Sequence, residues 1–585
     1  MPDAARTPSR RTLPTWLGAA ALGATLSAAL AAPASAQAPP DAARTLRAAA
    51  DAFHAPPAAG GGPRRPWPDL GDSTRAAAAA RLDRVRALLR EVRPESLRTP
   101  ADRLLHENLV EVTDASAGAR ICRLHLWAGT NQFGGWHVAA SNAARVQPVG
   151  TDAARATALD VFRALPAAIR AEEALLRRGL DSGYAAARPV IATVVRQLDD
   201  LLPADPAQSP LHAPAERDSS AAFRREWAAL LAEVVYPAGR AYRDFLQHEY
   251  MPRARSDGAL AGLPDGAACY AAWLRDRTSL RVDVDSVMTD ARREVDRLRA
   301  ELAPLALSLT GERDVGRAIV LLRTDPRFTF AHRDSVLPAY RAMTRRAAER
   351  VDRVVAGVAP ESLVVVAYPL FQERAGLPPQ YLRASDDGAR PAQFLVNLSR
   401  TERMAVANAV AHEAYPGHHL QRVAAARADV AHPAMRTLSV GAFVEGWGIY
   451  SEALADEMGL YETELDRAGY LVHLLDTAMA CWLDMAHHAH GWSRAALVDS
   501  MQALGGRTRE NAEAYADRHS GTPGQLATYY VGWRAIADAR RAAEARLGAA
   551  FRSPEFHREV LRDGTVTLAS LRRKLGEWEG VTPGR

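Results

Sequence analysis

Lysine is almost absent from this chain: of its 73 basic residues only Lys574 is a lysine, and the others are arginines. The 68 acidic residues nearly balance them, and both signs are interspersed without a long basic block. This pattern is typical of solvated helix faces and gives a weak surface field. We therefore expect no nucleic-acid partner and no binding to anionic membrane surfaces.

Cysteine is scarce as well. Cys122, Cys269 and Cys481 are odd in number and far apart, which excludes a disulfide framework. None of them has C-x-x-C spacing, so zinc ligation by cysteine is not expected. The sequence leaves open whether two of the three form a disulfide.

Only one apolar run, Trp16–Ala32, resembles a targeting segment. Arg10 and Arg11 precede it and Ala34–Ala36 offers a small-residue cleavage site, so residues 1–36 predict a signal peptide of the Sec type, with the twin-arginine route open. The run is short for a membrane span and lacks a stop-transfer flank. We expect export to the periplasm or beyond, with no stable membrane association after cleavage. Because residue 37, directly after the cleavage site, is Gln and not Cys, no lipid anchor is expected.

The rest of the chain divides at about residue 72. Residues 37–71 are rich in Ala, Pro and Gly and predict a flexible lead-in, whereas residues 72–585 repeat apolar positions at helical spacing and predict one large helical region, of one or two lobes. Two β-branched runs, 363–368 and 394–398, interrupt the helices. Either they hold an extended peptide by backbone pairing, or they form a purely structural hairpin.

Directly after the second run comes the stretch on which the interpretation depends, Val410–Gln421. It places His412 and Glu413 at the end of an apolar helical run, with His418 and His419 close behind. Zinc hydrolases use such a set, because imidazoles bind zinc and an adjacent carboxylate takes the proton of the bound water. The alternative is a buried, hydrogen-bonded histidine cluster. Ser399 and Glu402 predict a capping box at the start of this helix.

Pro416 occupies the position of the second histidine in the common H-E-x-x-H motif. Proline cannot donate to the carbonyl of residue 412, and Gly417 permits unusual backbone angles, so a kink or bulge after Tyr415 is expected. The bulge would bring His418 to the missing place. On an unbroken helix His419 would instead lie about 10 Å along the axis from His412, so His419 is expected beside the ligands or in the pocket wall.

A third ligand is expected from Gly441–Glu452. Glu445 and Glu452 are seven residues apart and share one helical face that is otherwise apolar. Burying two carboxylates there is costly without a metal or donors. We assign Glu445 as the zinc ligand and Glu452 as a carboxylate that orients a ligand histidine; a solvated acidic face is the alternative.

An oxyanion in a hydrolase needs a donor opposite the metal. The C-terminal third offers Arg518, His519 and Tyr529, and spacing alone does not choose among them. The apolar run 465–490 carries further histidines near its end, which predict either a second metal site or a solvated helix terminus.

Three segments together resemble the DUF885 family of bacterial zinc-peptidase-like proteins: His412-Glu413-x-x-Pro416-Gly417-His418, Glu445-Gly446-Trp447-x-x-Tyr450-x-Glu452 and Pro523-Gly524-Gln525-x-x-x-Tyr529-x-x-Gly532. The resemblance covers most of the chain and includes Asp484 and His488. It favours His418 as a ligand and Tyr529 as the donor. The second segment is also similar to that of thimet-type oligopeptidases, in which the first Glu binds zinc; those enzymes, however, have the plain H-E-x-x-H.

The sequence thus predicts a mostly α-helical, zincin-like protein with a small β element beside the motif helix and its zinc site within residues 399–532. One Zn²⁺ per chain would be held by His412, His418 and Glu445, with Glu413 as base and Tyr529 or His519 as oxyanion donor. His419, Glu452, Asp484, His488 and Arg518 would support the ligands or contact substrate. The family resemblance implies short peptides as the substrates. A zinc amidase or esterase, or a non-catalytic protein of the same fold, remains the alternative, and the oligomeric state is not predicted.

Overall fold

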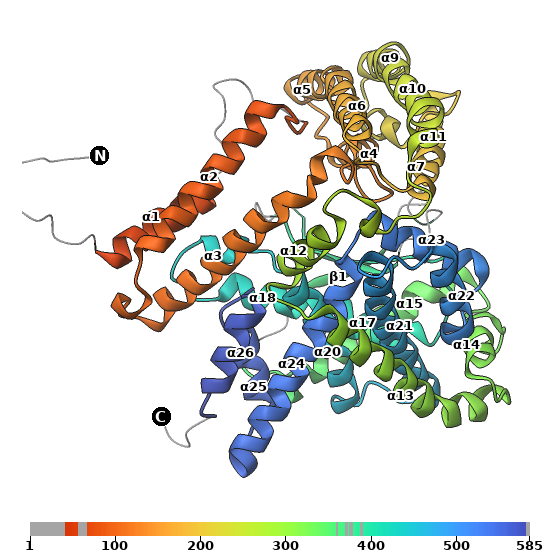
Figure 1. Cartoon of the computed structure of the whole chain (residues 1–585). Coiled ribbons are helices and arrows are strands. Elements are labelled where there is room, and N and C mark those ends of the chain that lie inside the picture. The colour runs from red at the N-terminus through yellow and green to blue at the C-terminus, as the bar shows by residue number, and fades with distance from the viewer. Residues whose placement is uncertain are drawn as a thin grey trace, which may run out of the picture. The chain divides into compact units, whose positions relative to one another are not determined.

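The computed structural model describes residues 41–55, 67–358, 361–368, 373, 378–385 and 390–580. The predicted signal peptide lies outside these ranges. Within them the chain is mostly helical with one small sheet (Figure 1). The predicted fold class is confirmed.

In the first half of the described chain, helices are joined by turns and loops, and no strand of the sheet occurs. Its α-helices are α1 (Ala42–His54), α2 (Asp72–Glu91), α3 (Pro100–Gly118), α4 (Trp136–Val146), α5 (Asp152–Arg163), α6 (Leu165–Asp181), α7 (Arg188–Leu201), α8 (Ala213–Arg217), α9 (Ala221–Leu230), α10 (Tyr236–Phe245), α11 (Met251–Arg253), α12 (Gly266–Thr278), α13 (Val284–Thr310), α14 (Val315–Thr324) and α15 (Val336–Arg350).

The second half carries the sheet and the remaining helices. The strands are β1 (Leu363–Ala367), β2 (Gln380–Leu382) and β3 (Ala392–Val396), and the helices are α17 (Ala405–Glu413), α18 (His418–Arg427), α19 (Ala434–Thr437), α20 (Gly441–Glu457), α21 (Glu464–His488), α22 (Arg494–Gly505), α23 (Arg509–Gly521), α24 (Gln525–Leu547), α25 (Ser553–Leu561) and α26 (Leu568–Glu577).

Two hydrophobic cores form among these helices. The larger one joins α1–α3 to the chain from α12 onward and includes Phe394, Phe443 and Trp447. The smaller one lies among α4–α11, where the rings of Phe162 and Trp227 pack 4.9 Å apart. Whether the helical region forms one or two lobes stays a prediction, although the smaller core shows that α4–α11 bury an apolar surface of their own.

Helix α1 corrects the expectation of a flexible lead-in over residues 37–71. Leu46, Ala49 and Ala50 have no exposed surface. Their spacing forms one apolar face, which packs in the larger core beside α2. The alanine-rich composition of this segment indicates a loose chain, but the same alanines favour a helix once a neighbouring surface covers them.

The sheet lies beside the motif helix and has the order β1-β3-β2. β1 pairs with β3 in parallel, with Val365 opposite Phe394, and β2 pairs antiparallel to β3, with Tyr381 opposite the same Phe394. The two predicted strands are confirmed within two residues. The three-residue β2 was expected as loop.

The expected capping box at Ser399 and Glu402 is wrong. α17 begins only at Ala405 and its N-cap, Met404, makes no side-chain cap. The Ser399 hydroxyl instead donates to Asn397 at 2.7 Å, and Glu402 forms a β-bridge with Thr329. The hydroxyl is therefore already used by the turn that follows β3.

Cys122 and Cys269 form a disulfide, and Cys481 is free and buried. The disulfide ties the 3₁₀ turn after α3 to α12. Across the described residues, no helix combines the length and the apolar character that crossing a bilayer requires.

Candidate metal centre

The predicted interruption at Pro416 is confirmed, and it is a complete break. α17 ends at Glu413, α18 begins at His418, and the peptide bond between Tyr415 and Pro416 is cis. Gly417 lies against the end of α17, where an added Cβ would come within 1.9 Å of the His412 carbonyl oxygen. Only glycine fits this approach, and it lets α18 start immediately beside His412.

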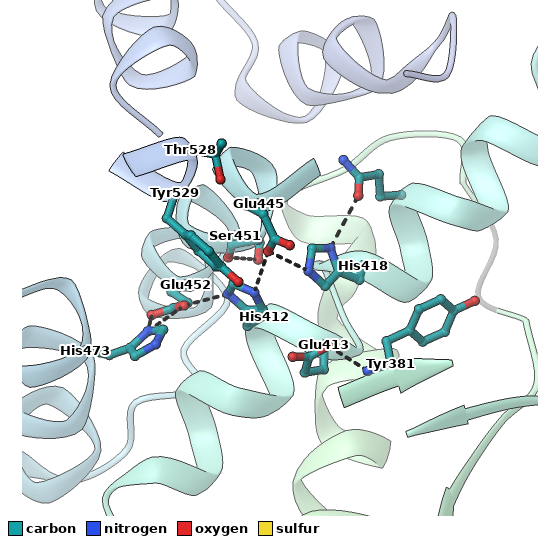
Figure 2. Close-up of polar contacts among 12 residues, drawn as sticks. Tyr381, His412, Glu413, His418, Glu445, Ser451, Glu452, His473, Thr528 and Tyr529 are labelled. Carbon is teal, nitrogen blue, oxygen red and sulfur yellow. Dashed lines mark hydrogen bonds and ion pairs between the residues drawn. The ribbon is translucent and has the colours of Figure 1, made fainter. Parts of the chain in front are cut away.

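The break brings three donor groups together (Figure 2). Each of His412, His418 and Glu445 contributes one donor atom, and these three atoms lie within 4.8 Å of one another. The Glu445 Oε2 atom is 3.8 Å from His412 Nε2 and 3.5 Å from His418 Nε2. Donors that bind one tetrahedral zinc at about 2.1 Å lie about 3.4 Å apart. The spacing and the nitrogen and oxygen donors therefore fit zinc.

Glu452 is fully buried behind His412. Its Oε1 accepts from His412 Nδ1 at 2.9 Å, and its Oε2 accepts from His473 Nδ1 at 2.8 Å. Because Nδ1 of His412 carries the donated proton, the Nε2 lone pair faces Glu445 and His418. This is the carboxylate–histidine arrangement that fixes a metal-binding imidazole.

Helix α20 supplies both carboxylates and also the space for His412. A Cβ at Gly448 would lie 2.6 Å from the His412 ring. Ser451 donates to the carbonyl of Ala411 at 2.8 Å, which joins α20 to α17. The Glu445 side chain keeps 25% of its surface exposed, so solvent reaches this carboxylate.

Glu413 lies beside these groups, next to the edge of the sheet. Its Oε2 accepts the backbone N–H of Tyr381 at 2.8 Å (Figure 2). Burial raises the pKa of Glu413, while His418 and His412 oppose the increase. The Tyr381 N–H thus fixes the position of the Glu413 carboxylate, and the raised pKa increases its basicity. A general base requires both.

Tyr529 covers His412 from α24. The two rings stack at 22° with centroids 6.3 Å apart. Burial, and then the charge of Glu445, raise the pKa of the Tyr529 hydroxyl far above its usual range, so it keeps its proton. The hydroxyl accepts from Gln525 Nε2 at 3.3 Å, which leaves its own hydrogen available for donation.

The electrostatic balance of the site favours a cation. Three carboxylates, Glu413, Glu445 and Glu452, face the imidazoles of His412, His418 and His473. Burial alone raises the pKa of Glu445, but the two neighbouring imidazoles outweigh it and hold that pKa well below its usual range. Neutral imidazoles with ionised carboxylates leave an excess of negative charge, which a divalent cation would compensate.

His419 points to the other side of α18. Its Nδ1 lies 3.4 Å from the Tyr381 hydroxyl and its Nε2 3.2 Å from the Glu361 carbonyl. Burial lowers its pKa. His419 therefore belongs to the wall between α18 and β2, apart from the three donors.

Asp484, His488 and His519 form a second buried cluster. Asp484 accepts from Tyr270 at 2.8 Å, from the N–H of Gly524 at 2.9 Å and from His519 at 3.2 Å. His488 Nε2 donates to the His519 carbonyl at 3.0 Å. His519 is thus bound to Asp484, whereas the Tyr529 hydroxyl has its hydrogen free for donation. Within the described residues the run 465–490 forms no second group of metal-binding donors. His488 is fully buried, whereas His490, just beyond the end of α21, is exposed and pairs with Asp285 at 2.8 Å, as expected of a solvated terminus.

Arg518 reaches the site indirectly. It donates to Gln525 Oε1 at 3.0 Å, and Gln525 in turn contacts Tyr529. His473 and the Tyr381 N–H are the site groups that sequence reasoning missed. His473 is one of several polar residues on the long helix α21 and belongs to no motif. A backbone N–H leaves no trace in the sequence.

No curated protein matches the chain. Among solved structures, "the putative lipoprotein from Colwellia psychrerythraea" aligns at a TM-score of 0.82 with 20% identity over 92% of this chain and 97% of that one. A "putative lipoprotein of unknown function from Shewanella oneidensis" aligns at a TM-score of 0.68 with 17% identity over 90% of this chain and 96% of that one. These likenesses show a shared fold.

An M32 carboxypeptidase from Deinococcus radiodurans R1 aligns at a TM-score of only 0.34, with 13% identity over 92% of this chain and 99% of that one. The family comparison is broader: residues 58–575 match the model of a bacterial protein of unknown function, DUF885. That span contains both clusters described above, and the chain belongs to the DUF885 family.

Proposed function

We propose that this protein is an exported, zinc-dependent metallopeptidase that hydrolyses short peptides. One observation carries the proposal: the donor atoms of His412, His418 and Glu445 converge within 4.8 Å beside Glu413, a carboxylate that is not needed as a ligand. A purely structural histidine cluster would not require a separate carboxylate with a free oxygen there.

Zinc in this site would bind the water and polarise the scissile carbonyl. The three donors would hold it, and Glu452 would keep His412 in the tautomer that offers Nε2. Each of these roles follows from a hydrogen bond or a spacing given above.

Glu413 and Tyr529 would move and hold the protons. With Oε2 on the Tyr381 N–H, Glu413 has Oε1 free to accept a proton from water and return it to the leaving amine. Tyr529 remains protonated and can donate to the oxygen of the tetrahedral intermediate. Arg518, through Gln525, would fix the direction of the Tyr529 hydroxyl.

Export is supported by independent features. Residues 1–36 have the pattern of a signal peptide, and a disulfide between Cys122 and Cys269 suits an oxidising compartment. The two solved structures of similar fold named above are each titled "putative lipoprotein". Nucleic acid and stable membrane partners are not part of the proposal.

The test uses the purified mature protein, from residue 37, with its metal content measured first. A mixed peptide pool is then digested and analysed by mass spectrometry, with Glu413→Gln as the matched control. Zinc-dependent cleavage of peptide bonds, lost in the control, is expected. A zinc-loaded protein that cleaves esters or non-peptide amides but no peptide would contradict the peptidase assignment.

A further inference from the structure

Arg422 stands out near the metal centre. It lies on α18 four residues after His418, so the two side chains share one face of the helix. Arg422 is half-buried, and Tyr381 and Glu445 both act on the pKa of its guanidinium. Tyr381 is also the residue whose N–H binds Glu413.

Arg422 has neither an ion pair nor a hydrogen bond with any described residue. Burial lowers its pKa, and the like charge of Arg383 adds to the effect. The contrast on the same helix is Arg427, which pairs with Glu361 at 2.7 Å. Burying a cation without a partner is unfavourable, and such a group at a site is expected to meet its anion in a ligand.

We propose that Arg422 binds the free C-terminal carboxylate of the peptide substrate, so that the enzyme acts as a carboxypeptidase. The inference rests on the proposed function and narrows it. A guanidinium is suited to this ligand because its planar N–H groups match a carboxylate in a bidentate pair. The partner of Arg422 is therefore an anion carried by the substrate. A peptide whose C-terminus is amidated lacks this anion and should bind more weakly.

The position along α18 indicates which bond is cut. Four helical residues rise about 6 Å between His418 and Arg422. One or two residues of extended chain span about 3.5–7 Å. A carboxylate held at Arg422 would therefore place a bond one or two residues from the C-terminus beside His418.

The experiment separates this role from catalysis by measuring binding. Zinc-loaded Glu413→Gln protein is titrated with N-acetyl-trialanine as the free acid and as the C-terminal amide, in a calorimeter. The acid should bind about 10- to 100-fold more tightly, the usual effect of a charge-assisted hydrogen-bonded pair. Adding Arg422→Gln should abolish the preference, while the matched change Arg427→Gln should leave it intact.

Activity supplies the second readout. In the wild-type background, Arg422→Gln should raise KM for the acid and leave the amide unaffected, and Arg422→Lys should restore part of the preference. Equal binding of acid and amide by the Glu413→Gln protein would overturn the inference, whatever the activity. So would loss of zinc from Arg422→Gln, which would assign the charge to Glu445. Failure of the proposed function would look different, as an absence of zinc or of peptide cleavage in the wild type.

Discussion

Two buried histidine–carboxylate clusters in this molecule use the same residue types and differ in what they leave free. In the cluster of Asp484, His488 and His519, the carboxylate accepts three donors and both nitrogens of His488 are engaged, Nδ1 by the N–H of Leu260. In the cluster of His412, His418 and Glu445, the Nε2 atoms of both histidines face one carboxylate that solvent can reach.

The electrostatics of the clusters differ in the same sense. Burial lowers the pKa of His488 to about 3, so that ring is neutral. The pKa of His412 is raised although burial lowers it, because Glu445 and Glu452 outweigh the burial. In the cluster of Asp484, His488 and His519 the carboxylate and both His488 nitrogens are used internally, and of these described groups only His519 Nε2 is buried without a partner. A metal centre instead keeps several donor atoms and an excess of negative charge directed at one point. The predictions below test that distinction.

The largest effect is expected from Glu413→Gln. Removing the general base should lower kcat by about 10²- to 10⁴-fold, while zinc content and circular dichroism stay as in the wild type because Glu413 is no ligand. Steady-state kinetics on a peptide substrate measure the change. A variant that retains a tenth of the wild-type kcat would rule the role out.

Asp484→Ala should act on stability and spare the metal. It leaves the donors of Tyr270, Gly524 and His519 without their buried acceptor, at a cost of about 3–5 kcal/mol in the free energy of unfolding. Urea denaturation measures this cost. Glu445→Ala is the matched change in the other cluster: it should lose zinc and alter the stability of the metal-free protein far less. If Asp484→Ala lost zinc but unfolded with the wild-type free energy, the cluster around Asp484 would not be the structural network described here.

Glu452→Gln should weaken the metal site without removing a ligand. The charge that orients His412 is lost, and changes of this kind typically cost about 10- to 100-fold in metal affinity. Competition with a chromogenic chelator measures the affinity. Glu457→Gln, on the same helix but in a surface pair with Arg540, should bind zinc like the wild type; equal affinities of the two variants would contradict the orienting role.

The smallest effect concerns acid sensitivity. His488 and His557 are fully buried, and burial lowers the pKa of each to about 3. A histidine in the unfolded chain has a pKa near 6.5. Below that pH the unfolded chain binds protons that the folded chain does not, so the free energy of unfolding decreases as the pH is lowered. Each should cost about 2 kcal/mol between pH 7 and pH 5.

The control for this effect is His557→Gln in the metal-free protein. Its free energy of unfolding is measured in urea at pH 7, 6 and 5. Between pH 7 and pH 5 this free energy should decrease by about 2 kcal/mol less than that of the wild type. Parallel curves would show that His557 does not titrate as described.

Much of the fold and the centre of the site could be predicted because their signals are local. Helical periodicity, the β-branched runs and the block at Pro416 each act within a few residues, and the seven-residue spacing of Glu445 and Glu452 places both on one face. The features that were missed depend on tertiary neighbours. α1 needs the larger core, β2 needs β3 as a partner, and the Ser399 hydroxyl is used by Asn397.

The roles of the polar residues in the C-terminal third were harder to assign for the same reason. His519 and Tyr529 are both donors close in sequence, and only the contacts separate them: His519 binds Asp484, and Tyr529 stacks on His412. His473 took part in no motif, and its role arises from the approach of α21 to Glu452.

The zinc content of four single variants tests the central claim most directly. The wild type should hold about one zinc per chain, as one tetrahedral site implies. His412→Ala, His418→Ala and Glu445→Ala should largely lose it, and His419→Phe should keep it, when purified protein is analysed by plasma mass spectrometry. Zinc kept in His418→Ala and lost from His419→Phe, or full occupancy in Glu445→Ala, would contradict the metal centre described here.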